Sequence, residues 1–138
     1  MTEVKPHNHL RLHDPKVIGP GIWFCMHSKS AKAKTLIAKQ KSIDDIRELQ
    51  ADFPCKMCKT HFGEYLEHHP PENSLDGDEK SIFHWTVDFH NDVNAATKKA
   101  QLSYREAEEL YFTDAIECEK SCFVEEQEPL NFTIRPIS

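Results

Sequence analysis

The segment Ser81-Ile-Phe-His-Trp-Thr-Val-Asp-Phe-His-Asn-Asp-Val-Asn-Ala-Ala-Thr-Lys-Lys99 decides the fold class, because it carries the strongest helix signal in the chain. Its apolar side chains recur every three or four residues, which places them on one face of a helix. Such a face must be covered by other elements that bury it. The apolar positions are Ile82, Trp85, Phe89, Val93 and Ala96.

Helix signals elsewhere predict an all-α fold, a four-helix bundle with a short fifth helix across it. Ser42 begins a variant of the capping box, and Ser103 is a second candidate N-cap. The His- and Pro-rich residues 1–20 should be extended, and residues 69–78 should form a loop. Residues 130–135 are the best strand candidate. We expect helices over residues 21–39, 42–53, 55–68, 81–99 and 104–112.

Length and charge limit the possible classes of protein. The chain has 138 residues, which suits one domain, and its net charge of -6 argues against a nucleic-acid binder. No apolar run is long enough to span a membrane, and the first residues lack the apolar core of a secretory signal. We expect an extended segment (residues 1–18), one domain (19–112) and a tail with a C-x3-C pair (113–138).

Two of the five cysteines form the motif Cys55-Lys-Met-Cys58 at the expected start of a helix. Helix N-termini stabilise thiolates, so we expect a lowered pKa and a pair suited to dithiol–disulfide exchange. Two other interpretations remain open. The pair could be an inert structural disulfide, or it could join Cys118 and Cys122 in a zinc-binding helical module.

The helix of residues 81–99 carries imidazole and amide groups where a solvated face would carry Lys and Glu. His90 and Asn94 share one face, and Trp23 and His27 repeat an aromatic–imidazole pairing four residues apart. Such a mixture suits a flat heteroaromatic ligand, with rings against its faces and polar groups at its edges. Each histidine taken singly could equally be an ordinary core residue.

Three ordered motifs resemble those of one family. They are Gly21-Ile-Trp-Phe-Cys-Met-His27, Phe53-Pro-Cys-Lys-Met-Cys58 and Trp85-Thr-Val-Asp-Phe-His-Asn-Asp-Val-Asn94. Their order and spacing are similar to those of the FAD-linked sulfhydryl oxidases of the Erv/ALR family, over residues 19–112. Three motifs in one order are far more specific than one.

The resemblance implies a flavin-dependent thiol oxidase that forms disulfide bonds in protein substrates and passes electrons through FAD to O2, giving H2O2. Cys55 and Cys58 would be the catalytic pair, with Cys58 beside the flavin and Cys55 accepting electrons. The resemblance also implies a protein dithiol or a thiol–disulfide carrier as partner, and a homodimer. The FAD contacts would come from Gly21, Trp23, His27, Cys58, His90, Asn91, Val93, Asn94, Lys99 and Tyr111.

The chain also departs from the family pattern. Thr97 and Ala100 replace a leucine and a proline, and Val87 and Tyr104 occupy the positions of a second disulfide found in many cellular members. That disulfide should therefore be absent. The neighbours of Cys25 suggest a buried thiol.

The C-terminal pair Cys118 and Cys122 follows the matched region. Family members often keep a second, shuttle pair on such an arm, so these cysteines could relay electrons to Cys55 and Cys58. They could also form a local disulfide or remain free. Compact members encoded by large DNA viruses fit this chain best. That origin would place it in host cytoplasm or a virion, and a cellular origin in the mitochondrial intermembrane space.

Overall fold

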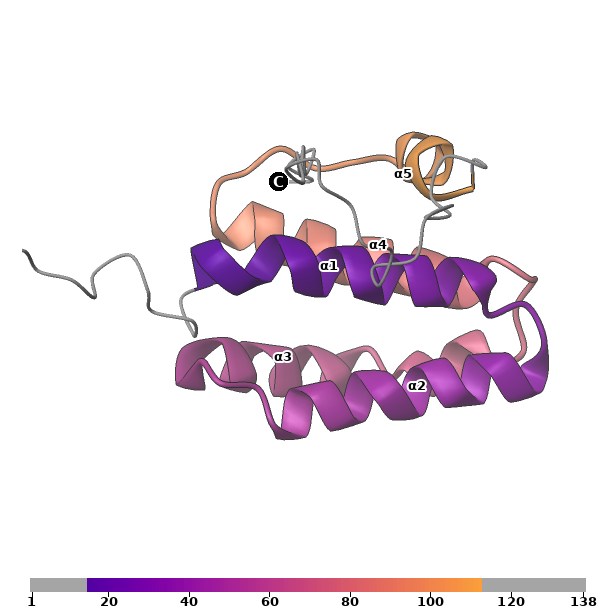
Figure 1. Cartoon of the computed structure of the whole chain (residues 1–138), viewed down its shortest axis with the longest axis horizontal. Coiled ribbons are helices and arrows are strands. Elements are labelled where there is room, and N and C mark those ends of the chain that lie inside the picture. Colours follow the sequence, from indigo (N-terminus) through magenta and orange to yellow (C-terminus); the bar gives the residue numbers. More distant parts are fainter. Residues whose placement is uncertain (1–14, 113–138) are drawn as a thin grey trace, which may run out of the picture.

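The computed structural model describes residues 15–112 and places them in a helical bundle, which confirms the predicted fold class. No strand occurs in this range. The longer helices run along the long axis in Figure 1, while the last helix, α5 (Tyr104–Tyr111), is seen nearly end-on and therefore crosses the bundle. The helices are α1 (Pro15–Lys32), α2 (Leu36–Ala51), α3 (Lys56–His68), α4 (Ser81–Ala96) and α5 (Tyr104–Tyr111), with the short 3-10 helix η1 (Pro71–Ser74) before α4.

The start of α1 differs from the sequence expectation. The helix begins at Pro15 and continues through Pro20, where an extended segment was predicted. Proline suits the first turn of a helix, and Pro20 lies only slightly beyond it, where it costs about one backbone hydrogen bond. The following turns place Trp23 and Met26 against the core, and that packing holds the helix together.

The boundary between α1 and α2 was also predicted in the wrong place. The chain leaves the helix after Lys32, and Thr35 caps α2 by accepting a hydrogen bond from the backbone N–H of Ala38. Ser42 is therefore an interior residue of α2, where its hydroxyl lies 3.1 Å from that of Ser30. The N-cap therefore lies seven residues before the predicted one, because the side chain of Thr35 satisfies the backbone N–H of Ala38.

The starts of α3 and α5 were predicted correctly because their caps are local, and α4 begins at Ser81 as predicted although its N-cap residue, Lys80, makes no side-chain cap hydrogen bond. Cys55 is the N-cap of α3, and Ser103 and Glu106 form a complete capping box at α5. Helix α4 ends at Ala96, three residues earlier than expected, because Lys98 adopts a positive φ of 59°. The N–H groups of Lys98 and Lys99 return to the carbonyls of Ala95 and Asn94, as in a Schellman motif.

Helix α4 is buried on two sides and is the centre of the molecule. The face that carries Ile82, Trp85 and Phe89 enters the main core with residues of α1, α2 and α3. The opposite face places Phe83 and Val87 in a second cluster with Ala107 and Tyr111 of α5. Because both faces pack, polar residues of α4 such as His90 are also buried.

The described residues contain no helix that combines the length and the apolar character needed to cross a membrane.

Candidate redox site

Cys55 and Cys58 lie at the N-terminus of α3, as the motif predicts. Cys55 is the N-cap residue in an extended conformation. The backbone N–H of Cys58 donates a hydrogen bond of 3.4 Å to the sulfur of Cys55. Both side chains are half-buried. The helix N-terminus therefore faces the sulfur of Cys55.

The pKa of Cys58 differs from expectation. Burial raises the pKa of the Cys58 thiol to about 11, and the hydrogen bond to Cys55 and the negative charge of its sulfur add to the rise. The predicted lowering of the pKa is therefore wrong for Cys58 in the dithiol state. A backbone hydrogen bond lowers the pKa of Cys58, but it is the smallest of these effects, and a second negative charge beside the first is unfavourable.

Three ring side chains of the predicted ligand site form a continuous stack between α1 and α4. Trp23 lies parallel to His90, with ring centroids 4.0 Å apart and planes 6° apart. His27 follows, with its ring centroid 5.1 Å from that of His90. The sequence prediction that Trp23 and His27 lie with His90 agrees with this arrangement.

The two histidines are linked by hydrogen bonds and kept neutral by burial. His27 Nε2 lies 2.9 Å from His90 Nδ1, and His27 Nδ1 lies 2.9 Å from the hydroxyl of Thr86. Burial, followed by the charge of His90, lowers the pKa of His27 to about 3. Burial and then the charge of Lys99 lower the pKa of His90 to about 4.

Tyr111 and Asn94 extend the site on either side of the stack. The ring of Tyr111 packs 5.0 Å from that of His27, and its hydroxyl is buried without a hydrogen-bond partner among the described residues. Burial, with a smaller effect from Cys25, raises the pKa of this hydroxyl. Asn94 is also buried, one helical turn after His90. An unpartnered buried hydroxyl calls for an explanation, and a bound ligand is one.

The remaining predicted contacts are placed less uniformly. Asn91 turns toward the loop before α5, where its amide donates to the carbonyl of Leu102 at 2.7 Å and accepts from its N–H at 2.9 Å. Val93 packs against the main core. Gly21 and Lys99 are exposed, although the charge of Lys99 reaches His90.

A contact between α3 and α4 brings the cysteines to the same end of the bundle as the ring stack. His61, one turn after Cys58, lies 2.9 Å from Asp92 through its Nε2 atom. Asp92 stands between His90 and Asn94 on α4. This pairing aligns the N-terminal half of α3 with the C-terminal half of α4, as the common left-hand end of these helices in Figure 1 indicates.

The other cysteines have separate outcomes. Cys25 is exposed on α1, so the expectation of a buried thiol is wrong. Its neighbours Met26 and His27 are buried, and Cys25 lies at the edge of an apolar cavity that Met26 also lines. Cys118 and Cys122 lie outside the described residues, and within residues 15–112 no cluster of three or more His, Cys, Asp or Glu side chains could hold a metal ion.

Sequence reasoning missed Thr86 and the pair of His61 and Asp92. Thr86 is completely buried and contacts His27, which is 59 positions away in the chain. No local pattern predicts such a contact. The spacing of three residues does indicate that His61 lies on the same helix face as Cys58, because residues three apart are neighbours on a helix.

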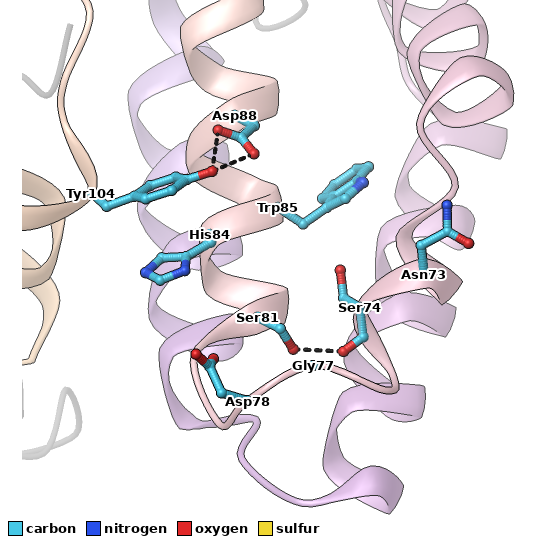
Figure 2. Close-up of a pocket in the computed structure, with 9 residues that line it drawn as sticks. All are labelled: Asn73, Ser74, Gly77, Asp78, Ser81, His84, Trp85, Asp88 and Tyr104. Carbon is cyan, nitrogen blue, oxygen red and sulfur yellow. Dashed lines mark hydrogen bonds between the residues drawn. The ribbon is translucent and has the colours of Figure 1, made fainter.

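A separate cavity of about 360 Å³ lies at the N-terminal end of α4. Figure 2 shows Tyr104 directed at Asp88, whose two carboxylate oxygens accept hydrogen bonds from its hydroxyl. Ser81 and His84 complete this side, and the His84 ring stacks on that of Tyr104 at 4.1 Å. None of the predicted site residues lines this cavity.

Comparisons with known proteins agree with the three motifs. The chain is similar to the 088R protein of frog virus 3, isolate Goorha, with 30% identity over 106 residues that cover 72% of this chain and 69% of the relative. An FAD-linked sulfhydryl oxidase of African swine fever virus, isolate Pig/Kenya/KEN-50/1950, is 31% identical over 98 residues, or 67% of this chain and 78% of that protein. The FAD-linked sulfhydryl oxidase of isolate Tick/Malawi/Lil 20-1/1983 is 29% identical over 114 residues, 77% of this chain and 92% of that protein. The model of the Erv1 / Alr family matches residues 20–113, and the chain belongs to this family.

Proposed function

We propose that this protein is an FAD-dependent sulfhydryl oxidase that converts dithiols of protein substrates into disulfides. The observation that carries the proposal is the Cys55–Cys58 pair at the N-terminus of α3, aligned with a buried ring stack on α1 and α4. Membership of the Erv1 / Alr family supports it, as do relatives named FAD-linked sulfhydryl oxidases. All three relatives are virus proteins, which favours a viral origin.

The residues present fit FAD. The rings of Trp23, His27 and His90 offer flat surfaces, and Asn94 offers hydrogen bonds at an edge. The unpartnered hydroxyl of Tyr111 is the observation that most directly favours a bound group. Gly21 leaves open space where a side chain would otherwise stand. When bound, FAD supplies the two-electron chemistry that passes electrons from a dithiol to O2 and yields H2O2.

The remaining contacts were expected to include Asn91, Val93 and Lys99. Asn91 already bonds to the backbone of Leu102 with both ends of its amide, so its contribution would be to hold the loop before α5. Val93 would support the ring stack from the core, and exposed Lys99 would offer a positive charge.

The cysteines would exchange electrons with substrate through a mixed disulfide. In the oxidised enzyme, a substrate thiolate attacks the sulfur of Cys55, the Cys55–Cys58 bond breaks, and Cys58 leaves with the electron pair. The second substrate thiol loses its proton and attacks its partner's sulfur in the mixed disulfide, which releases Cys55. The substrate loses two electrons and the enzyme pair gains them. We expect attack at Cys55 because it lies outside the helix as the N-cap of α3, and because the family resemblance assigns Cys58 to the flavin side.

The C-terminal pair Cys118 and Cys122 would act as a shuttle between substrate and Cys55. Charge supports this role: the surface beside Cys55 carries exposed Lys56 and Lys59, and no acidic residue lies in the first turn of α3. Residues 113–138 contain six Asp or Glu and two Lys or Arg. Cys118→Ser and Cys122→Ser should slow turnover of a protein dithiol and leave dithiothreitol turnover unchanged. If the variants oxidised the protein dithiol as fast as the wild-type protein does, the relay through Cys118 and Cys122 would be ruled out.

A homodimer is part of the proposal. A largely apolar cavity of about 200 Å³ opens between α1 and α2, lined in part by Ile22, Met26 and Ile46. Exposed Leu36 and Ile37 add apolar surface at the start of α2. Sedimentation analysis of the full chain would test this state.

The absorption spectrum of the purified chain tests the function most directly. A flavin band, with H2O2 formed from dithiothreitol and O2, is expected. Cys55→Ser and Cys58→Ser should abolish turnover while keeping the flavin band, and Cys25→Ser is the matched control that should retain activity. A colourless protein containing zinc would instead support the zinc-binding helical module of Cys55, Cys58, Cys118 and Cys122.

A further inference from the structure

Thr86 stands at the inner end of a buried hydrogen-bond chain that crosses from α4 to α1 and back. Its hydroxyl contacts His27 Nδ1, and His27 Nε2 contacts His90 Nδ1, both at 2.9 Å. The same hydroxyl also lies 2.6 Å from the carbonyl of Phe83. All the members of this chain are at most 5% exposed, so water competes little with these contacts.

The proton positions in this hydrogen-bond chain follow from counting its donors and acceptors. A carbonyl can only accept, so the single hydroxyl proton of Thr86 is donated to Phe83, and its oxygen must accept from His27 Nδ1–H. A neutral imidazole carries one proton, so His27 Nε2 is an acceptor. The contact with His90 then requires a proton on His90 Nδ1.

Neutrality of both rings is needed for this count, and the surroundings provide it. Burial keeps the pKa of both histidines far below neutrality, at about 3 for His27 and about 4 for His90. The rings that face them are aromatic: Trp23 stacks on His90, and Phe83 and Tyr111 border His27. The nearby charge that acts on His90 is Lys99, which also opposes protonation.

We propose that Thr86 is a positioning residue that fixes both buried histidines as Nδ1–H tautomers and makes His90 Nε2 a hydrogen-bond acceptor. Resting on the proposed function, this assigns the group of FAD that meets His90. It must be a donor, such as a hydroxyl of the ribityl or ribose units or an amino group. A phosphate oxygen would face a lone pair there.

The side chain at position 86 therefore determines the polarity of a site that it does not touch. Without the hydroxyl, His27 Nδ1–H has no acceptor. The hydrogen bond between the two rings then reverses: His27 Nε2–H donates to His90 Nδ1, and His90 carries its proton on Nε2. The outer edge of His90 changes from acceptor to donor, although every ring stays in place.

Two-bond ¹H–¹⁵N NMR correlation spectra of the uniformly labelled full chain read these tautomers directly. In the wild-type protein, both rings should give the pattern of a protonated Nδ1 and a bare Nε2. Thr86→Val has nearly the same shape and should convert both rings to Nε2–H. Thr86→Ser keeps the hydroxyl and should retain the wild-type pattern.

FAD affinity provides a second readout. Thr86→Val should raise the Kd for FAD about fivefold to tenfold, the effect of losing one hydrogen bond, whereas Thr86→Ser should leave it within about twofold. A wild-type His90 protonated on Nε2, or unchanged tautomers in Thr86→Val, would overturn the assignment. If Thr86→Val does not fold, the wild-type and Thr86→Ser spectra still decide. Failure of the chain to bind FAD would remove the proposed function but leave the tautomer assignment intact.

Discussion

The two redox cysteines have different surroundings although only two residues separate them. Cys55 lies outside the helix as its cap and receives the N–H of Cys58, while Cys58 lies in the first turn and loses hydration. The sequence predicted the pair and its position. It did not predict which sulfur the helix N-terminus would face, because that depends on the conformation of a single cap residue.

This difference predicts selective alkylation of the reduced protein. Because burial and the neighbouring sulfur raise the pKa of Cys58 to about 11, Cys58 should stay protonated and react slowly with iodoacetamide near neutral pH. Mass spectrometry after limited labelling should find Cys55 and exposed Cys25 modified well before Cys58. Equal labelling of Cys58 and Cys55 would contradict the assigned asymmetry.

The buried histidines predict a stability that falls in acid. The folded-state pKa values of His27 and His90, about 3 and about 4, lie below the ordinary value of 6.5, so the unfolded chain binds more protons than the folded one between these values. Each histidine should therefore cost up to about 1.4 kcal/mol per pH unit as the pH falls from 6.5 toward 4.

Urea unfolding at several pH values measures this slope. His27→Gln should reduce the slope of the unfolding free energy between about pH 6.5 and pH 5 by close to one bound proton. An unfolding free energy that is flat over this range in the wild-type protein would argue against buried neutral histidines.

At the scale of elements, helices with local caps were predicted and long-range anchors were not. Ser103 and Glu106, three residues apart, predict the start of α5 from the local sequence alone. Whether α2 begins at Thr35 or at Ser42 depends on how the helix packs. Lys39 reads in the sequence as a surface residue, yet it is only 3% exposed. Its partners lie 35–39 positions away, beyond any local pattern.

Lys39 anchors the segment between η1 and α4 to α2. Its ammonium group donates to the carbonyls of Ser74, Gly77 and Asp78 at 3.4, 3.0 and 2.7 Å. Lys39→Met keeps most of the apolar stem but leaves these acceptors unpaired. It should lower the free energy of unfolding by about 2–3 kcal/mol in urea titrations.

Lys41→Met is the matched control, since Lys41 is exposed on the same helix, and its effect should stay within about 0.5 kcal/mol. If both substitutions had equally small effects, the segment would not depend on the buried ammonium group.

At the scale of the whole molecule, the sequence predicted the helical bundle but only one of the two buried faces of α4. The apolar stripe of α4 was read as one face against a core. The second face became clear only when α5 was placed over it, with Phe83 and Tyr111 in one cluster. Burial on two sides leaves α4 only a narrow solvated strip, which carries Asp88 and Asp92. This explains why His90 and Asn94 replace the charged residues expected there.

The buried hydroxyl of Tyr111 predicts how FAD should change overall stability. A ligand present at about 100 times its Kd stabilises the folded chain by about 2.7 kcal/mol, which should raise Tm by roughly 10 °C. Tyr111→Phe removes an unpartnered buried hydroxyl, so it should leave the Tm without FAD unchanged or higher and reduce the rise on adding FAD.

Thermal unfolding of both proteins, with and without FAD, checks this opposite response. Phe112→Leu, a change at the neighbouring position in the same cluster, should lower both Tm values and keep the rise. A full rise in Tyr111→Phe would mean that the hydroxyl makes no contact with FAD.

The parallel stacking of Trp23 on His90 also gives the molecule an optical signal of its own. The chain has two tryptophans, and the other, Trp85, donates its indole N–H to the carbonyl of His69 at 2.8 Å. Fluorescence from the first indole would report events at the ring stack, and emission from the second would report only the integrity of the core. Replacing either indole with phenylalanine would separate the two emissions and allow occupancy and unfolding to be followed independently in one sample.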